Sequence, residues 1–379
     1  RKLRHYYIME SSPLIGLNSF IMIVEGVKGK SGLQNINGNE NIIGYCLSVP
    51  VGKKKFTKLV SRVLNMLFYV FGSIYYGIKL RKRYRKIWIS VPHPGSAIAG
   101  LILSKLFKKN IIYEIRDPWP ELLIELNIIK KNSLLSKFLK FLDVYLQDRA
   151  EKIILAFNNT SFVKSIHLKK TIVLNNFIPD QILEKIDFKR RIPIKNEIHL
   201  IFAGGAANAY MLDILIRSIY LTKLKYKIRV FLNLYVDERE KKRYQPLVNE
   251  LNLADFINFY NKLPYLELLK NIQRHDFYVL HLKNLDIFKY GINSNKLLDP
   301  FICGRPIIFA AEIKDNWVMK SGAGLICKPE SPEDLADKIF EAYNLIHYNY
   351  SRYEEMCLKS YNFARNELSL SKKIGKVNF

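Results

Sequence analysis

The 379-residue sequence is poor in cysteine, and its few cysteines form no recognisable pattern. Cys46, Cys303, Cys327 and Cys357 stand far apart along the chain. No Cys-x-x-Cys pair occurs, and no two histidines have His-x-x-x-His spacing. The sequence therefore predicts neither a disulfide framework nor a common type of zinc site. Cysteines used in this way are typical of a reducing cytoplasm.

Two nucleotide-binding patterns are also absent. The sequence contains no Gly-x-x-x-x-Gly-Lys-Ser/Thr loop and no Gly-x-Gly-x-x-Gly turn. These absences argue against a P-loop NTPase and against a dinucleotide-dependent dehydrogenase. The first residues lack the charged, apolar and small-residue succession of a signal peptide.

Acidic residues are scarce relative to basic ones. The chain has 60 Lys and Arg against 34 Asp and Glu, a formal net charge of +26. A surface of this kind attracts polyanions such as nucleic acid, anionic lipid or phosphorylated ligands. The excess could equally reflect a general enrichment in Lys, Asn, Ile and Tyr that has no functional meaning, and both interpretations stay open.

The apolar residues follow an alternating pattern from residue 86 onward. Short β-branched or aromatic runs alternate with longer helical stretches, an order that predicts parallel strands covered by helices. The expected strands are 86–91, 110–117, 152–157, 171–176, 199–205, 227–236, 256–262, 277–282, 306–310 and 323–329. The sequence thus predicts an α/β protein in which ligands bind at the carboxyl ends of the strands.

The alternation is interrupted once, by a polar stretch that divides the chain into two Rossmann-like domains. We expect an N-terminal domain over residues 1–180, a linker over 181–196 and a C-terminal domain over 197–357. Residues 358–379 are expected to pack back on the N-terminal domain. Two domains also suit a chain of this length, since 49% of its residues are hydrophobic and can fill two cores.

Residues 52–86 form a basic and apolar segment that contains no acidic residue. Its uncharged part runs only from residue 63 to residue 78, which is short for a transmembrane helix. Clusters of Lys and Arg on both sides favour a helix that lies on an anionic membrane surface. A buried core helix with solvated ends is the alternative.

The stretch SNKLLDPFICGRPIIFA, which begins at Ser294, combines charge with helix-start signals. Lys296 and Asp299 are one turn apart and share a helix face. Asn293, Ser294 and Asn295 are residue types that cap helix N-termini. A helix start with a lysine suits an anion, and the carboxylate could bind sugar hydroxyls, so a nucleoside diphosphate fits the pair. An ordinary capped helix with an ion pair is the alternative.

The stretch YEIRDPWPE follows the expected strand 110–117. It brings Arg116 and Asp117 to the carboxyl end of that strand and offers Trp119 as a flat surface for a sugar or a lipid. We expect Asp117 to orient or deprotonate an acceptor hydroxyl, with Glu114 and Arg116 nearby. His93, at another strand end, is a further acceptor-side candidate. A structural Arg–Asp pair that closes the turn is the alternative.

Five segments in the same order resemble retaining GT-B glycosyltransferases of glycosyltransferase family 4. They are 113–121, 173–180, 201–213, 294–310 and 321–339. The similarity covers most of the chain beyond residue 45 and is greatest to the bacterial branch that builds O-antigen and capsular polysaccharide. It implies a GT-B fold, in which two Rossmann-like domains face a central cleft.

The resemblance also implies a donor site in the C-terminal domain. Asp299 matches the second glutamate of the family's Glu-x7-Glu motif, which holds the donor ribose, and Lys296 lies beside the diphosphate and is expected to assist catalysis. The implied donor-binding residues are Gly204, Gly205, Asn208, Asn293, Ser294, Asn295, Lys296, Asp299, Gly322 and Gly324.

The sequence departs from the family at three places. Gly291 occupies the position of the first glutamate, residues 206–210 lack the family's Arg and Lys, and residues 234–239 lack its Gly-Asp-Gly turn. These losses either move the phosphate-neutralising role to Lys296 or mark an inactive copy. No Asp-x-Asp occurs either, so departure of the diphosphate should need no metal or other cofactor.

The resemblance therefore predicts a retaining glycosyltransferase. We expect a UDP-sugar donor, a polyprenyl-linked saccharide acceptor and a peripheral position on the inner face of the cell membrane, in lipopolysaccharide or capsule biosynthesis. A sugar-nucleotide 2-epimerase has the same architecture and is one alternative. A non-catalytic basic scaffold for membrane or nucleic acid is the other, although no nucleic-acid motif supports it.

Overall fold

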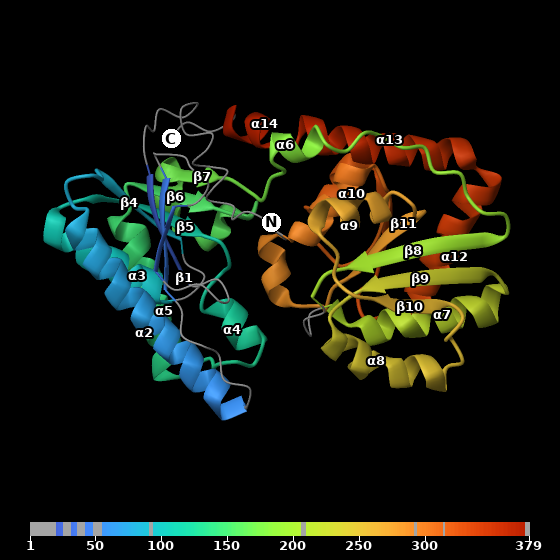
Figure 1. Cartoon of the computed structure of the whole chain (residues 1–379), viewed down its shortest axis with the longest axis horizontal. Coiled ribbons are helices and arrows are strands. Elements are labelled where there is room, and N and C mark those ends of the chain that lie inside the picture. Colours follow the sequence, from blue (N-terminus) through green and yellow to red (C-terminus); the bar gives the residue numbers. More distant parts are fainter. Residues whose placement is uncertain are drawn as a thin grey trace. The chain divides into compact units, whose positions relative to one another are not determined.

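The structure is a computed structural model, and it describes residues 20–25, 32–35, 42–47, 55–90, 94–205, 210–291, 294–313 and 315–375. The chain divides into two compact units (Figure 1). One comprises residues 2–175 with 374–379, and the other comprises residues 176–373. We call them the N-terminal unit and the C-terminal unit.

The N-terminal unit contains two sheets. The larger is fully parallel, with the order β4-β5-β6-β7, and the smaller has the order β1-β3-β2, with β1 parallel and β2 antiparallel to β3. The strands are β1 Phe20–Glu25, β2 Gly32–Asn35, β3 Ile42–Leu47, β4 Lys86–Ser90, β5 Asn110–Ile115, β6 Lys152–Leu155 and β7 Thr171–Val173. The helices are α2 Lys55–Lys79, α3 Pro94–Phe107, α4 Glu121–Glu125, α5 Leu134–Arg149, η2 Thr160–Phe162 and η3 Ser165–Lys170.

Strand β5 lies at the centre of the larger sheet. Every residue of β5 after Asn110 is buried, as expected for a parallel strand covered on both faces. Helices α3 and α5 pack against this strand and against each other. Tyr113 of β5 donates a hydrogen bond of 2.8 Å to Asp143 of α5, so a polar contact also joins strand and helix.

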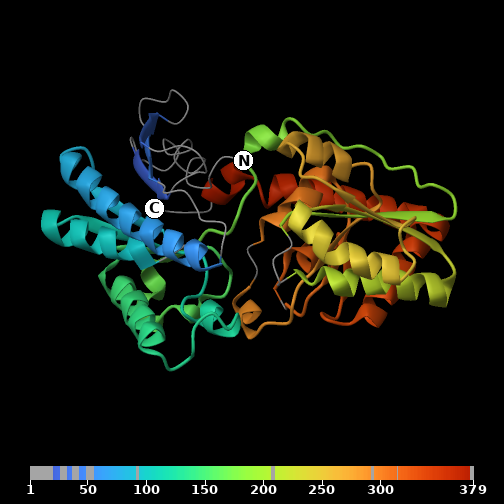
Figure 2. The ribbon, with the colours of Figure 1, turned by 60° about the horizontal axis from the view of Figure 1, so that its bottom comes forward.

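Helix α2 packs along α3 (Figure 2). Its other side leaves one apolar stripe in solvent. The exposed residues recur at helical spacing: Leu64, Leu67, Phe68, Phe71, Tyr75 and Ile78. The helix is therefore not a core helix buried on all sides. Over the part of the chain that the structure describes, no helix combines the length and the apolar character that crossing a bilayer requires.

The C-terminal unit contains one six-stranded parallel sheet with the order β10-β9-β8-β11-β12-β13. Its strands are β8 Glu197–Ala203, β9 Arg229–Tyr235, β10 Ile257–Tyr260, β11 Phe277–His281, β12 Ile307–Ala310 and β13 Gly324–Cys327. Its helices are α6 Asp180–Leu183, α7 Leu212–Tyr226, α8 Glu238–Glu250, α9 Tyr265–Ile272, η5 Asp286–Tyr290, α10 Asn295–Cys303, α11 Trp317–Ser321, α12 Pro332–Tyr348, α13 Tyr350–Asn366 and α14 Leu370–Gly375, whose last residues belong to the N-terminal unit.

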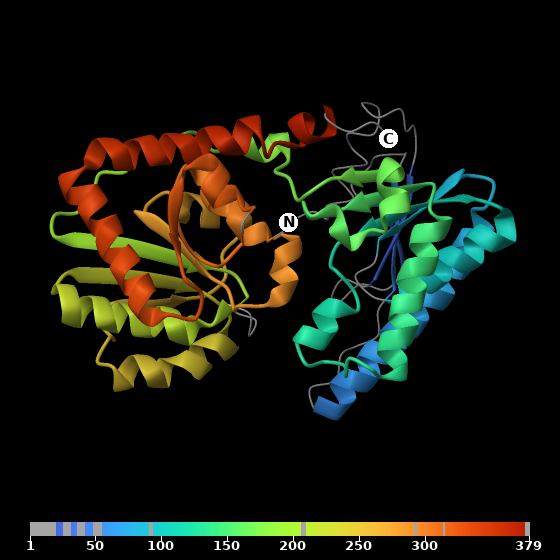
Figure 3. The ribbon, with the colours of Figure 1, turned by 180° about the vertical axis from the view of Figure 1, so that it is seen from behind.

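Helices cover both faces of this sheet. Helix α7 packs against α12 and α8, whereas α10 packs against α9 and α13 (Figure 3). The central strands β11 and β12 are buried along their whole length, which explains their unbroken apolar sequences. The strand order reverses between β8 and β11, and such a switch point is where open α/β sheets bind ligands, at the carboxyl ends of the strands.

The segment that we expected to be a linker, residues 181–196, belongs to the C-terminal unit. Arg305 is fully buried, and its guanidinium donates hydrogen bonds to the backbone carbonyls of Lys189, Gln273 and Gly304. Arg191 forms an ion pair of 2.8 Å with Asp276. The Arg305 hydrogen bond to Lys189 and the Arg191–Asp276 ion pair therefore attach residues 187–191 to the C-terminal unit. The polar composition of this stretch gave no sign of these contacts.

The C-terminal end of the chain, which we expected to pack back on the N-terminal domain, is divided between the two units. Residues 358–373 belong to the C-terminal unit and residues 374–379 to the N-terminal unit. The physical reason is the apolar face of α13, where Tyr353, Met356 and Cys357 are buried in the core of that unit. Beyond α13, the Ile178 carbonyl accepts a hydrogen bond of 2.9 Å from the Leu370 N–H.

Candidate functional site

The first element of the site is the turn that follows β8. Gly204 has φ +125°, which an L-amino acid rarely adopts, and its N–H donates to the Tyr235 carbonyl of β9 at 2.9 Å. The buried Tyr278 of β11 donates its hydroxyl to the Ala203 carbonyl at 3.0 Å. Burial raises the pKa of Tyr278 well above its usual value, and Asp299 adds to the increase, so this hydroxyl keeps its proton. The carboxyl end of β8 is thus rigidly held at the switch point.

The second element is the start of α10. Ser294 is the N-cap, and its hydroxyl accepts the Lys296 N–H at 3.3 Å. The Leu297 N–H donates to the Ser294 carbonyl at 3.2 Å. Two of the first N–H groups are therefore satisfied within the turn, so an anion here would depend more on the Lys296 side chain than on free amides.

The Lys296 side chain extends from α10 to the turn after β8. A Cβ added to Gly204 would collide with its Cε atom and stand 3.1 Å from its Nζ atom. The ammonium lies 3.8 Å from the centre of the Tyr210 ring and 6.0 Å from that of Phe202. The tertiary structure thus brings Lys296 and Gly204 together, although 92 residues of sequence separate them.

Asp299 points in another direction. It is 5% exposed, and one carboxylate oxygen accepts the Tyr265 hydroxyl of α9 at 2.8 Å. Lys296 and Asp299, both within the described residues, form no ion pair with each other. The ion pair of the alternative interpretation is therefore absent, whereas its helix cap is present, so an ordinary capped helix stays the alternative to a binding site.

The remaining glycines of the predicted donor site have backbone roles. Gly322 has φ +62° and ends α11 in the left-handed conformation. Gly324 begins β13, where an added Cβ would collide with the Ile307 carbonyl of β12. Gly205 faces open space, Asn295 is exposed, and Gly291 has φ +103° at the end of η5.

Three predicted site residues lie outside the described residues: Asn208, Asn293 and His93. Their roles stay predictions.

The acceptor-side candidates occupy the carboxyl end of β5 in the N-terminal unit. Glu114 is fully buried and accepts a hydrogen bond from Trp88 Nε1 at 3.3 Å. This burial places Glu114 inside the fold and away from solvent. Asp117 is exposed, and Arg116 is partly exposed. The charge of Arg116 acts on Asp117, so a structural Arg–Asp pair stays the alternative to a catalytic role.

Two of these side chains have unusual surroundings. Partial desolvation by neighbouring protein raises the pKa of Asp117, while the charge of Arg116 acts in the opposite direction. Trp119 is partly buried, and its Nε1–H is buried without a hydrogen-bond acceptor in the described structure. Trp119 lines a small pocket of about 20 Å³, together with Tyr113 and Asp143. Trp119 therefore turns part of its surface inward.

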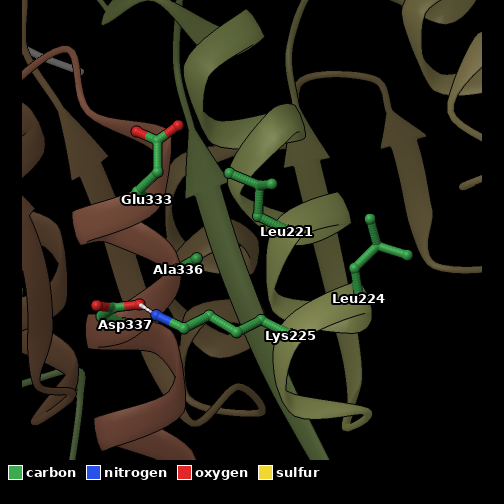
Figure 4. Close-up of a pocket in the computed structure, with 6 residues that line it drawn as sticks. All are labelled: Leu221, Leu224, Lys225, Glu333, Ala336 and Asp337. Carbon is green, nitrogen blue, oxygen red and sulfur yellow. Dashed lines mark hydrogen bonds and ion pairs between the residues drawn. The ribbon is translucent and has the colours of Figure 1, made fainter.

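A larger pocket lies elsewhere in the described structure. It has a volume of about 250 Å³ and is lined by Leu221, Leu224 and Lys225 of α7 and by residues of α12 (Figure 4). Lys225 spans it with a hydrogen bond of 2.8 Å to Asp337. The lining residues of α7 belong to its last turns, far along the helix from the turn after β8. Ligands of open α/β sheets bind at the carboxyl ends of the strands, so we do not place the site in this pocket. No cluster of metal-ligating side chains occurs among the described residues.

Two residues that contact Lys296 and Asp299 were not predicted from the sequence. The Tyr210 ring lies 3.8 Å from the ammonium of Lys296, and Tyr265 donates a hydrogen bond to the carboxylate of Asp299. Tyrosine is abundant in this chain, with 23 copies, so residue type alone offered no signal. Only the position of Tyr210 within the segment 206–210, which lacks the family's cations, could have drawn attention to it.

Comparisons with known proteins support the fold. No protein-family model and no curated protein matches the sequence. Solved structures do match: sucrose-phosphate synthase from Thermosynechococcus elongatus has a TM-score of 0.70 at 12% identity, over 99% of this chain and 92% of that one. A glycosyltransferase from Rickettsia africae has a TM-score of 0.60 at 13% identity, over 98% and 91% of the two chains.

A third match is Anabaena HepE in complex with UDP and glucose. Its TM-score is 0.58 at 13% identity, over 88% of this chain and 84% of that one. These likenesses confirm the predicted fold class: the chain is an α/β protein with the GT-B fold. At such low identity they show the fold alone, and the assignment to the O-antigen branch stays a prediction.

Proposed function

We propose that the protein is a retaining glycosyltransferase that takes a sugar from a nucleotide sugar, most simply a UDP-sugar. The observation that supports this proposal is the position of Lys296, a half-buried cation at the switch point of the C-terminal sheet. A cation in this place suits a diphosphate. UDP is present in the similar HepE structure, which favours uridine among the nucleotides.

In this proposal the donor lies along the first turns of α10. The diphosphate contacts Lys296 and the turn at Gly204, and the ribose hydroxyls donate to Asp299. As the C1–O bond to the diphosphate breaks, negative charge grows on the leaving oxygen, and Lys296 stabilises it. The acceptor oxygen bonds to C1 on the same face, and its proton passes to the departing phosphate. No metal is part of this reaction.

We propose a lipid-linked saccharide as the acceptor, with Asp117 orienting the hydroxyl that attacks. Asp117 is solvent-exposed at the carboxyl end of β5, where a ligand can reach it. The raised pKa of Asp117 indicates a carboxyl group that shares protons more readily than an ordinary surface aspartate.

A membrane surface is the proposed location of this acceptor. The apolar stripe of α2 lies between basic clusters, and residues 55–86 include nine Lys and Arg and no Asp or Glu. Such a helix suits the interface of an anionic bilayer. Within the described residues, Cys303, Cys327 and Cys357 are buried free thiols, which agrees with a cytoplasmic position on the inner face.

A panel of nucleotide sugars tests the donor assignment. UDP-, GDP- and dTDP-sugars are added to the full chain, and the true donor should raise the melting temperature, because a ligand at 100 times its Kd stabilises by about 2.7 kcal/mol. We expect Asp299→Asn to weaken nucleotide binding. Lys296→Ala should slow transfer more than it weakens binding.

The buried position of Asp299 requires a control for misfolding. Tyr265→Phe removes the hydrogen bond to Asp299 but keeps the carboxylate, so it should bind the nucleotide nearly as well as wild type. Wild-type turnover in both Lys296→Ala and Asp299→Asn would contradict this donor site. Epimerisation of the UDP-sugar without acceptor would support the 2-epimerase instead.

A further inference from the structure

An aromatic ring, that of Tyr210, lies beneath Lys296, and the proposed function gives it no role. Tyr210 directly precedes Met211, the N-cap of α7, and the Lys296 ammonium lies 3.8 Å from its centroid. A cation at this distance is attracted by the negative face of the ring. The Phe202 ring, at 6.0 Å, lies at the limit of such an attraction.

The path of the Lys296 side chain is also constrained. Because an added Cβ on Gly204 would collide with Lys296 Cε, the lysine must pass directly over the Gly204 α-carbon. Gly204 itself is held by the hydrogen bond from its N–H to the Tyr235 carbonyl. The lysine stem therefore crosses a fixed backbone turn before it reaches Tyr210.

The charge of Lys296 is left uncompensated by this arrangement. No carboxylate among the described residues forms an ion pair with its ammonium, which is half-buried. A carboxylate at position 210 would also hold the lysine, but it would neutralise the charge. An aromatic ring holds the cation and leaves its positive charge available to an anion.

We propose that Tyr210 is a positioning residue that holds the Lys296 ammonium at the carboxyl edge of β8, where the diphosphate of the nucleotide sugar binds. This inference rests on the proposed function and adds to it a residue that acts through Lys296. Residues 206–210 offer no cation in the sequence. A lysine from another element, α10, lies against the last residue of that stretch, Tyr210.

The first test needs no ligand. The full chain is prepared with lysine labelled at Cε, and the Lys296 signal is assigned by its loss in Lys296→Arg. A ring below the ammonium shifts the attached protons upfield of those of other lysines. We expect this shift in wild type and in Tyr210→Phe, and its loss in Tyr210→Leu. An unshifted Lys296 signal in the wild-type protein overturns the inference, even if Tyr210→Leu does not fold.

The second test measures UDP binding by calorimetry. Tyr210→Leu should weaken UDP roughly 3- to 10-fold, a cation–π effect at a partly buried site, whereas Tyr210→Phe should stay within about 2-fold of wild type. In a Lys296→Ala background, Tyr210→Leu should have no further effect. Tyr220→Leu, at another partly buried tyrosine that packs on the same core, is the matched control and should bind UDP normally.

The outcomes separate the inference from the proposed function. If Lys296→Ala weakens UDP binding but Tyr210→Leu does not, or if the two effects add, Tyr210 does not position Lys296 and the proposed function stands. If Lys296→Ala leaves UDP binding unchanged, or UDP does not bind to the wild-type protein, the proposed donor site fails and this inference fails with it.

Discussion

At the scale of single residues, Lys296 and Asp299 leave the same helix in different directions. Lys296 reaches back to the turn after β8, whereas Asp299 enters the interface with α9. One turn of α10 therefore offers a cation and a carboxylate that do not neutralise each other. This separation is what a ligand with one anionic part and one hydroxylated part requires.

Gly204 is the residue on which the position of Lys296 depends most. We expect Gly204→Ala to destabilise the protein by about 1–2 kcal/mol, because an L-residue at φ +125° is strained. We also expect weaker UDP binding, because the new Cβ displaces Lys296. Urea unfolding and calorimetry measure the two effects. Gly205→Ala, where the added methyl group meets open space, is the control; equal behaviour of the two variants would contradict the prediction.

Asp143 provides a pH-dependent prediction. Burial raises its pKa from 3.8 to about 6, although the Tyr113 hydrogen bond opposes the increase. In the unfolded chain the carboxyl ionises near pH 4, whereas in the folded chain it ionises near pH 6. The folded state therefore loses stability as pH rises from 4 to 6, by up to about 3 kcal/mol, and loses no more above that.

The variant Asp143→Asn isolates this effect, because an amide does not ionise. We expect the difference in unfolding free energy, wild type minus variant, to fall between pH 4 and pH 6 and then to level off. Urea unfolding of both proteins across pH 4 to 8 measures it. Other titrating groups are common to both proteins and cancel in the difference. Parallel curves over this range would show that the pKa of Asp143 is not raised.

At the scale of elements, helix α2 has two faces with different surroundings. One face packs against α3, and the other exposes an apolar stripe next to basic residues. A stripe of this size is unfavourable in water, so we infer that it has a partner. A bilayer with anionic headgroups matches both its apolar and its charged parts.

Vesicle binding tests this partner. Phe71, at 67% exposure, and Tyr75, at 60%, are the most exposed members of the stripe. We expect the double variant Phe71→Ser/Tyr75→Ser to bind vesicles containing anionic lipid roughly 10-fold more weakly or worse, because it loses two aromatic side chains from the interface. Cosedimentation measures the binding, and higher salt should weaken it. Leu224→Ser on α7 is the control, at 56% exposure.

At the scale of the whole molecule, the GT-B fold supplies two α/β units. The C-terminal unit carries the Lys296 and Asp299 pair, and the N-terminal unit carries Asp117. In the proposed reaction, transition-state charge on the diphosphate is stabilised by Lys296. Metal ions have no part in the stabilisation that we propose.

Metal removal tests this view of the reaction. We expect sugar transfer by the full chain to proceed in EDTA at a rate within about 2-fold of that in Mg²⁺ or Mn²⁺, since a lysine can replace a Lewis acid at the leaving group. The measurement is nucleotide release with the donor that the thermal-shift panel identifies. Activity that disappears in EDTA and returns with Mn²⁺ would contradict the metal-free mechanism.

Periodicity in the sequence was sufficient for most of the architecture. The ten strands expected from residue 86 onward correspond to β4 through β13, with ends that differ by a few residues. Buried parallel strands are continuous apolar runs, so their signal is local. The helix start at Ser294 was also predictable, because capping depends on residues adjacent in sequence.

Only the tertiary structure decided which side chains meet. Tyr210 lies against Lys296 because two strands that are not consecutive in sequence, β8 and β11, are neighbours in the sheet. Arg305 fixes the expected linker, and the apolar face of α13 places that helix in the C-terminal unit. Local patterns encode the conformation of a segment, whereas the direction of a long side chain depends on packing between distant segments. The sequence by itself therefore determined the strands beyond residue 86, the helix start at Ser294 and the charged residues of the candidate site, and the fold decided how those residues are oriented and what they contact.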